Sequence, residues 1–282
     1  ITPSILTIKS VGGSTTKVYD ANKKVTDTSR LTFVVGSSNG GANGENGFFT
    51  FEGEYDDKRV GEGKKVTLKF TFTKPTSGNY IVNESELVDN VIVRELAVGS
   101  ITPKELEVKL DKLRSGKATR VYNGATWYGG ENGATYSSGT SARSAVYRSG
   151  EGFIVEGFPT AEQNGTVTIS ANYQEVDRRN RAMFDSYVNF VYVDENNVYH
   201  KGTVTNKLFK TLVFSISGTC AQNYTFKVTN GTDAYSDTVG NAGQSVTVYD
   251  SRDEQNKDKR PANAGNINIE ITVKSFKVEY TN

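Results

Sequence analysis

Short segments in which apolar and polar residues alternate cover much of the chain. In the clearest one, 66–72, every second residue is apolar, from Val66 to Phe72. A period of two is typical of a β-strand with one face in the core and the other in water. Similar runs, rich in Val, Ile, Thr, Phe and Tyr and separated by Gly, Asn, Ser and Asp clusters, predict strands at 4–11, 31–35, 48–55, 65–73, 79–83, 90–97, 105–113, 153–158, 166–174, 186–193, 198–205, 211–217, 224–229, 245–249 and 267–280.

The same pattern predicts the fold class. No stretch of a dozen residues has convincing helical periodicity, so we expect an all-β protein. Many short strands with regular turn signals favour two tandem β-sandwich (Ig-like) domains. The alternative is a pair of β-grasp-like units, each with one short helix. Residues 194–197 join two strand-like runs and predict a hairpin there.

Three landmarks occur twice, in the same order, which indicates an internal repeat. The pairs are Ile1-Thr2-Pro3 with Ile101-Thr102-Pro103, Val18-Tyr19-Asp20 with Val121-Tyr122-Asn123, and 67–70 leading to Asn79-Tyr80 with 211–214 leading to Asn223-Tyr224. We therefore predict a compact domain at 1–100 and a longer copy at 101–270, with insertions at 124–152 and 233–268 whose fold stays open. Because Ile271-Thr272 resembles the first landmark, 271–282 is either a closing strand or the start of a next repeat.

Composition narrows the class of partner. The 282 residues carry 33 basic and 32 acidic side chains, a net charge of +1, which predicts no nucleic-acid partner and no membrane contact. One Cys excludes an internal disulfide, and no apolar run is long enough for a membrane helix. Since the first residue is Ile instead of Met, we expect a piece of a longer protein.

The landmarks resemble the YDG family of repeats found in filamentous-haemagglutinin-like bacterial adhesins. The Lys-x-Tyr-Asp-Gly opening of that family is similar to 17–21, which ends in Ala21, and to 120–124, which begins with Arg120. Two further family segments are similar to 57–66 and 218–224. The resemblance covers the first copy nearly end to end and the two ends of the second. It implies a stalk-like or adhesive tandem module, extracellular at the cell surface or cell wall, with no catalytic residues.

Catalytic and metal sites are poorly supported by the residues. His200 and Cys220 are the only residues of their types, which argues against a nucleophile–base pair or a Cys–His zinc site. Gly61-Glu62-Gly63-Lys64 lacks the spacing and the following helix of a phosphate loop. We predict no enzyme and no cofactor. Asp250 and Asp253 are weak calcium candidates.

The paired Tyr and Asp or Asn residues of the landmarks have a structural interpretation. A Tyr at a strand end buries its ring, and Asp or Asn bonds the backbone of the following turn. We therefore predict structural roles for Tyr19, Asp20, Tyr122, Asn123, Asn79, Tyr80, Asn223 and Tyr224. A Lys–Asn isopeptide cross-link stays open, since it depends on burial and geometry.

The 124–152 insertion contains the ligand-binding candidates. Trp127, Tyr128, Tyr136 and Tyr147 lie among Gly, Ser, Thr and Arg, a composition typical of recognition loops. They form either a binding site, which could stack on sugars, or a loop that packs its own aromatics onto the domain. The leading hypothesis is a bacterial surface adhesin segment, monomeric when isolated, that binds a host or neighbouring-cell surface glycan or protein. The alternative is a carbohydrate-binding module of a larger secreted enzyme; a glycosidase would need an acid pair that the sequence does not identify.

Overall fold

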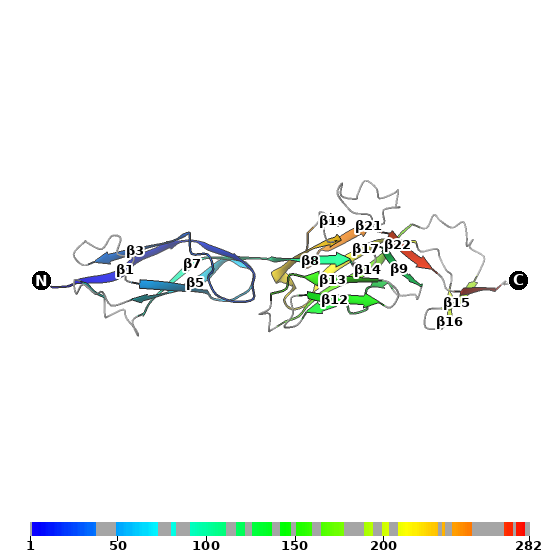
Figure 1. Cartoon of the computed structure of the whole chain (residues 1–282), viewed down its shortest axis with the longest axis horizontal. Helices are drawn as coiled ribbons and strands as arrows, with labels where there is room; N and C mark the ends of the chain where they lie inside the picture. Colours follow the sequence, from blue (N-terminus) through cyan, green and yellow to red (C-terminus); the bar gives the residue numbers. More distant parts are fainter. Residues whose placement is uncertain are drawn as a thin grey trace. The chain divides into compact units, whose positions relative to one another are not determined.

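The computed structural model consists of two compact units, unit 1 at Ile1–Lys104 and unit 2 at Glu105–Asn282 (Figure 1). Both are built from strands, and in the part of the chain described here the only helical element is the 3-10 turn η5 at Ala221–Asn223. The all-β prediction is confirmed, and no α-helix of the β-grasp alternative is found in that part of the chain. The structure describes residues 2–37, 49–72, 80–82, 91–110, 117–121, 126–136, 142–147, 151–159, 165–177, 189–193, 199–202, 208–230, 233–234, 239–249, 268–272 and 275–279.

The described strands of unit 1 form two sheets. Its strands are β1 Ser4–Gly13, β2 Thr15–Val18, β3 Leu31–Ser37, β4 Phe49–Tyr55, β5 Gly61–Phe72, β6 Tyr80–Val82 and β7 Val91–Thr102. One sheet has the order β3-β1-β6 and the other β2-β7-β5-β4. The first strand run supplies both sheets, because β1 belongs to the first and β2, directly after it, to the second.

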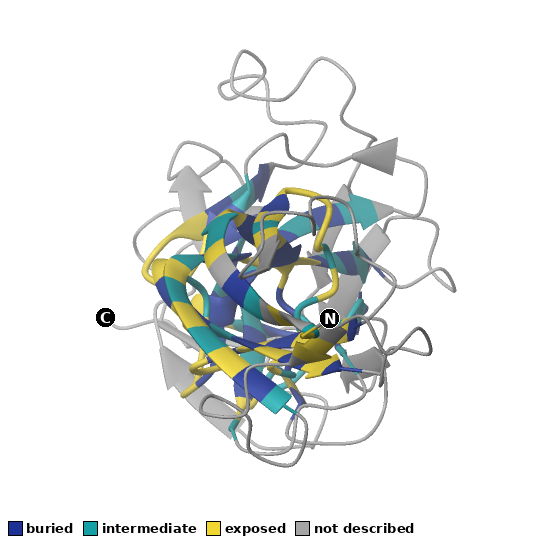
Figure 2. Ribbon diagram, turned by 90° about the vertical axis from the view of Figure 1, so that its left-hand side faces the viewer, coloured by how far each residue is buried: buried dark blue, intermediate teal, exposed yellow. Residues whose placement is uncertain are grey.

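Aromatic side chains join the two sheets of unit 1. On β5 the alternation places Val66, Leu68, Phe70 and Phe72 in the core, as Figure 2 shows for buried and exposed positions along the strands. Phe33 of β3 meets Phe70 edge-on with 5.8 Å between ring centroids, and it also contacts two rings of β4. The sheets therefore pack face to face, as the layers of a sandwich do.

A glycine allows the chain to change sheets between β1 and β2. Gly13 has φ +91°, a conformation that residues with a Cβ rarely adopt, and a Cβ there would clash with the carbonyl oxygen of Arg30. The neighbouring Ser14 N–H donates to the same oxygen at 3.3 Å. The crossover is therefore a tight contact of two backbones that a side chain would block.

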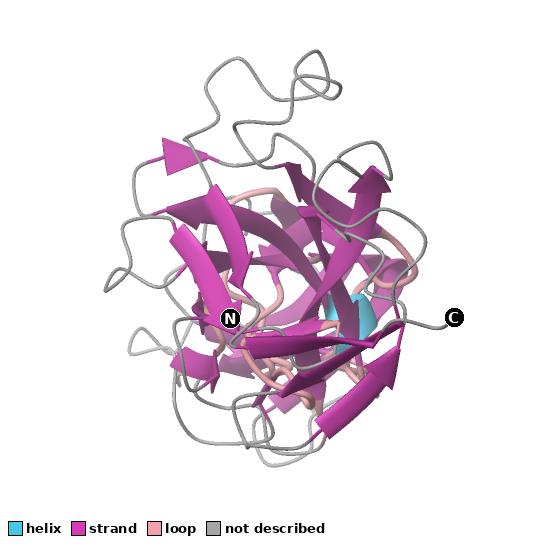
Figure 3. Ribbon diagram, turned by 90° about the vertical axis from the view of Figure 1, so that its right-hand side faces the viewer, coloured by secondary structure: helices cyan, strands magenta, loops and turns pink. Residues whose placement is uncertain are grey.

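The described strands of unit 2 form two larger sheets and two small ones. Figure 3 shows that strands predominate in the described part of the chain. The sheet orders are β10-β14-β17-β21 with β11 beside β14, β12-β13-β8-β18-β19 with β20 beside β18, β16-β15-β23, and β22-β9. The strands are β8 Lys104–Leu110, β9 Lys117–Val121, β10 Trp127–Tyr128, β11 Ala134–Tyr136, β12 Ala142–Tyr147, β13 Glu151–Glu156, β14 Val167–Asp177, β15 Asn189–Val193, β16 Tyr199–Gly202, β17 Leu208–Ser217, β18 Tyr224–Asn230, β19 Asp233–Ala234, β20 Gly240–Asn241, β21 Ser245–Tyr249, β22 Asn268–Thr272 and β23 Ser275–Glu279.

The core of unit 2 lies between its two larger sheets. Phe153 of β13 contacts Phe214 of β17 edge-on at 5.6 Å, and it stacks with Tyr128 of β10 at 6.2 Å. Phe158, which follows β13, stacks on Tyr136 of β11 at 4.3 Å. Unit 2 is thus also a face-to-face pair of sheets closed by aromatic contacts.

The two units share one strand arrangement. The order β3-β1-β6 in unit 1 corresponds to β13-β8-β18 in unit 2, and β4-β5-β7 corresponds to β14-β17-β21. The repeated landmark 67–70 lies in β5 and its partner 211–214 in β17, and each of these strands is central in its sheet. Strands β10–β12, β15, β16, β19, β20 and β23 are additions to this common arrangement.

The repeated landmarks also meet in one register. In unit 1, β2 pairs in parallel with β7, with Lys17 opposite Ile101 and Val18 opposite Thr102. In unit 2, β9 pairs in parallel with β22, with Arg120 opposite Ile271 and Val121 opposite Thr272. The single strand β7 therefore corresponds to two strands, β21 and β22, which the 250–267 segment separates in sequence.

The predicted hairpin is confirmed, because β15 and β16 pair antiparallel with Tyr192 opposite His200. Strand β23, within the predicted 271–282 segment, pairs with β15 and so belongs to unit 2. No helix in the described part of the chain has both the length and the apolar character needed to cross a membrane.

Candidate functional site: the Lys17 cluster and the Trp127 strand

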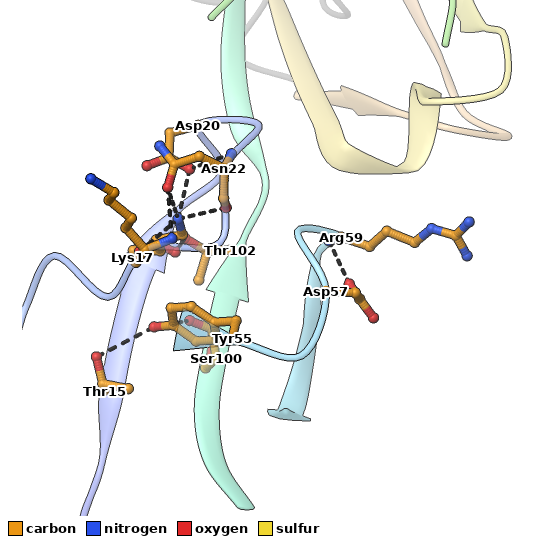
Figure 4. Close-up of polar contacts among 10 residues, drawn as sticks. Thr15, Lys17, Asp20, Asn22, Tyr55, Asp57, Arg59, Ser100 and Thr102 are labelled. Carbon is orange, nitrogen blue, oxygen red and sulfur yellow. Dashed lines mark hydrogen bonds and ion pairs between the residues drawn. The ribbon is translucent and has the colours of Figure 1, made fainter. Parts of the chain in front are cut away.

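A buried lysine organises the turn after β2. We call Thr15, Lys17, Asp20, Asn22 and Tyr55 the Lys17 cluster (Figure 4). The Lys17 Nζ donates to Asp20 Oδ1 at 2.7 Å, to the Asn22 carbonyl at 2.8 Å, to Asn22 Oδ1 at 3.0 Å and to the Lys24 carbonyl at 2.9 Å. Only 3% of its side chain is exposed, and Nζ lies 5.4 Å from the centre of the Tyr55 ring. The charge is thus neutralised by close oxygens and an aromatic face.

The local sequence explains this geometry. Alternation along β2 turns Thr15 and Lys17 inward. Asp20 Oδ1 then accepts from the Asn22 N–H at 3.1 Å, and Asn22 Oδ1 accepts from the Lys24 N–H at 2.8 Å. These two successive Asx turns bend the chain around Nζ and aim its carbonyls at the ammonium.

Ala21 lies at the tip of this bend with φ +64°, and it is the only described non-glycine residue at positive φ. This left-handed conformation favours glycine, since a Cβ makes it unfavourable by about 1 kcal/mol. Gly124 stands at the matching position of the second landmark. The conformation of Ala21 therefore gives a physical reason for a glycine at this place in the motif.

Tyr55 connects the cluster to β7, because its hydroxyl donates to the Ser100 carbonyl at 3.5 Å. Its hydroxyl lies 3.3 Å from Thr15 Oγ1, and Thr15 Oγ1 donates to the Asp27 carbonyl at 2.6 Å. Burial raises the pKa of Tyr55, and the nearby Asp20 and Asp27 act in the same direction, while the hydrogen bond with Thr15 lowers it. Tyr55 therefore stays neutral in ordinary conditions and acts as a buried hydroxyl group.

The cluster is built for stability instead of reaction. Four oxygen atoms accept hydrogen bonds from the Lys17 ammonium group, and all four belong to the turn that follows β2. The backbone adds to the structural role, because the Tyr19 N–H donates to the Thr102 carbonyl at 2.9 Å.

A second lysine, Lys64, fixes the loop between β4 and β5. Its Nζ lies 2.7 Å from Asp57 Oδ1 and 3.8 Å from Asp56 Oδ1. Partial burial acts to raise the pKa of Asp57, but the hydrogen bonds from Lys64 and from the Arg59 N–H outweigh it and the pKa falls. Gly61 and Gly63 lie at the start of strand β5, next to the ion pair of Lys64 with Asp57.

The structure corrects two of the four ligand-binding candidates. Tyr128 and Tyr136 are 3% and 0% exposed, and the Tyr128 hydroxyl donates to the Gly152 carbonyl at 2.8 Å. They belong to the core, because alternation on β10 and β11 turns them inward. Trp127 faces the opposite way and is half-buried. Tyr147 ends β12, and its side chain lies outside the described residues.

With this geometry established, comparison with protein families gives one assignment. Residues 2–87 match the YDG domain. The YDG domain includes the whole Lys17 cluster and the Lys64 ion pair, but ends before β7, the strand that pairs with β2. Neither the curated proteins nor the solved structures that were compared contain a match to the chain.

The remaining predicted residues lie partly outside the described chain. Within the YDG domain Tyr19 is buried, Asp20 binds Lys17, and Tyr80 begins β6, while Asn79 is not described. In unit 2, Asn223 and Tyr224 are buried at the start of β18. Tyr122, Asn123, Asp250 and Asp253 lie outside the described residues.

Metal and thiol chemistry were weak predictions, and the described residues add little to them. They contain no group of three or more His, Cys, Asp or Glu that could hold a metal ion. His200 lies on β16, and Cys220 is buried next to η5. The buried, structural role of Lys17 was not predicted from the sequence, because a lysine in an alternating strand is usually assigned to the solvent face.

Proposed function

We propose that the chain is a segment of a bacterial cell-surface adhesin, in which unit 1 is a spacer and unit 2 binds the ligand. It acts by binding and not by catalysis, at the outside of the cell or in the cell wall. The ligand is a glycan or protein on a host or neighbouring cell.

The observation that carries the spacer role is the Lys17 cluster. The polar groups of the YDG motif bond to one another and to their own backbone, with Lys17 buried at the centre. Polar groups that satisfy one another in this way hold a turn and are not presented to a ligand. A domain whose characteristic motif serves its own fold suits a repeated structural unit.

The binding role of unit 2 is supported by Trp127. It is the only Trp of the chain, it lies on an edge strand, and its side chain is half-buried on the outer side of the sheet. Exposed aromatic residues supply large contact areas with little loss of side-chain entropy. The same observation favours the second candidate, a carbohydrate-binding module of a larger secreted enzyme.

Localisation is tested with antibodies to the chain on intact source cells. We expect labelling of the cell surface and digestion of the chain by externally added protease. Protection from the protease in intact cells, with digestion after lysis, would contradict the proposal.

Binding is tested with the full 282-residue chain on immobilised glycans and host-matrix proteins, beside Trp127→Ala and the control Glu95→Ala. Glu95 is exposed on the outer side of β7 in unit 1. We expect saturable binding that Trp127→Ala weakens about tenfold and Glu95→Ala leaves unchanged. Absence of binding by folded protein would contradict the adhesive role of unit 2 and leave both units as spacers.

A further inference from the structure

The outer face of one sheet in unit 2 is covered by small uncharged side chains. Along β14, Val167, Ile169, Ala171 and Tyr173 are buried, so the residues between them face outward. The same alternation applies to β17 and β21. We call the outward set the hydroxyl face: Trp127, Thr135, Thr168, Ser170, Asn172, Val213, Ser215, Ser217, Ser245 and Thr247.

Strand pairing arranges these side chains in rows across the sheet. Ser170, Ser215 and Ser245 form one row, and Thr135, Thr168 and Ser217 form the next. The Oγ1 atoms of Thr135 and Thr168 lie 3.0 Å apart, and the Oγ atoms of Ser170 and Ser215 lie 3.1 Å apart. The backbones that carry these rows lie about 4.8 Å apart across the strands, and residues on one face of a strand repeat about every 6.8 Å along it.

A third row places the tryptophan beside the hydroxyl groups. Trp127 pairs with Asn172, which pairs with Val213, which pairs with Thr247. Asn is disfavoured in strands, so strand propensity does not explain Asn172 in the middle of β14. The row therefore combines an aromatic ring at the sheet edge with an exposed amide next to it.

The neutrality of the hydroxyl face is not a property of the fold. The equivalent outer face of unit 1, on β4, β5 and β7, carries Glu52, Glu54, Lys65, Lys69 and Glu95. The opposite outer face of unit 2 is charged too, with Lys109 2.6 Å from Glu156 and Lys227 3.0 Å from Glu105. The described side chains of the hydroxyl face include no ionisable group. Among the described residues, the hydroxyl face thus lacks the charged side chains that the other two outer faces carry.

From this contrast we infer that the hydroxyl face binds a neutral polysaccharide, with Trp127 stacked against a sugar ring. Hydroxyl and amide groups both donate and accept hydrogen bonds, which matches the hydroxyl groups of a sugar. A face without charge gives no counter-charge to an anionic glycan, so an uncharged chain is the complementary partner. The amphipathic indole ring suits the apolar C–H side of a pyranose. The inference names the ligand class and surface for the binding role proposed for unit 2, and rests on it.

The test uses the full chain with the neutral polysaccharides dextran, mannan and xyloglucan and the charged polysaccharides heparin and hyaluronate. Binding is measured by affinity electrophoresis and calorimetry for the wild type, Trp127→Ala, Ser215→Lys and Thr71→Lys. Thr71 follows Phe70 as Ser215 follows Phe214, so Thr71→Lys places the same charge at the equivalent position of unit 1. Because residue 215 points outward, the Ser215→Lys variant keeps the core intact, and circular dichroism checks the fold of each protein.

We expect a neutral polysaccharide to bind, with about tenfold weaker binding for Trp127→Ala and for Ser215→Lys and no change for Thr71→Lys. Binding of only charged polysaccharides or of a protein, unaffected by Ser215→Lys, would overturn the inference and leave the adhesive role intact. Failure of all ligands, including those of the broader panel, would overturn both. A wild-type dimer that Ser215→Lys dissociates, measured by light scattering, would overturn the inference in favour of a self-association surface.

Discussion

At the scale of single residues, Lys17 shows how a charged side chain can form part of a β-domain core. Burying an ammonium group is unfavourable unless it is paired and hydrogen-bonded. Lys17 meets that condition with four acceptors supplied by a turn that begins three residues later. The short motif therefore encodes both the charge and the oxygens that compensate it.

Replacing Lys17 by Met should destabilise unit 1 by about 3 kcal/mol. Met retains much of the apolar volume, but the Asn22 and Lys24 carbonyls lose their donor. The partial exposure of Asp20 keeps the effect from being larger. Urea unfolding followed by circular dichroism measures the change. Lys65→Met, on the exposed side of β5, is the control; equal stability of the two variants would show that the cluster contributes nothing.

Replacing Ala21 by Gly should stabilise unit 1 by about 0.5–1 kcal/mol, because glycine adopts φ +64° without the Cβ penalty. The same substitution at Ala97, exposed in the regular strand β7, should have the opposite sign. Thermal melts of the two variants compare them directly. If Ala21→Gly lowers the melting temperature as Ala97→Gly does, the conformational explanation of the motif glycine is wrong.

Residue types alone could not decide which of the ligand-binding candidates face the core and which face the surface. Trp127 and Tyr128 are neighbours, so on a strand they face opposite sides, and one is core while the other is surface. Their segment is rich in Gly and too short to show alternation in the sequence. The structure assigns the two faces because β10 pairs with Asn172 and Ala171 of β14.

At the scale of elements, the crossover from β1 to β2 determines which sheet each half of the first strand joins. The sequence predicted one strand at 4–11, and the alternation of β5, in the other sheet, was equally plain. Strand β2 was missed because it has only four residues, one of them a buried lysine. Short strands such as β10 and β11 were missed for a related reason: pairing with β14 holds them, and their own sequence pattern does not.

Replacing Gly13 by Ala should destabilise unit 1 by at least about 2 kcal/mol, because the new Cβ meets the Arg30 carbonyl oxygen and φ is +91°. Gly61→Ala is the matched control, since Gly61 has no atoms within 4 Å of its Cβ position and is not at positive φ. Urea midpoints of both variants give the comparison. A Gly13→Ala protein as stable as the control would mean that the crossover relaxes without cost.

At the scale of the whole molecule, repeated strings of residues lie at corresponding places in the two units. In both units the landmarks meet at the same parallel pairing. The landmarks did not predict that the counterpart of β7 in unit 2 is divided into β21 and β22, because the sequence between these two strands has no strand pattern. Insertions change the length of a copy without changing which strands are neighbours.

The two compact units should unfold in separate transitions. Trp127, the only Trp, lies in unit 2, so its fluorescence follows that unit alone, while circular dichroism follows both. Lys17→Met should shift only the unfolding transition of unit 1, which changes the circular dichroism but not the fluorescence. Phe153→Ala removes a core ring of unit 2 and should shift only the unfolding transition of that unit. A single transition shifted by both variants would contradict independent units.

The parallel pairing of β2 with β7 gives unit 1 a mechanical property. A pulling force on the chain enters unit 1 through β1 and leaves it through β7. The part of the force that β1 passes on acts on the start of β2, which lies at the opposite end of the paired segment from the end of β7 because the two strands run in the same direction. The hydrogen bonds between Thr15–Val18 and Gly99–Thr102 then resist this force together, in shear, and do not break one after another. The β9–β22 pair repeats this parallel arrangement in unit 2.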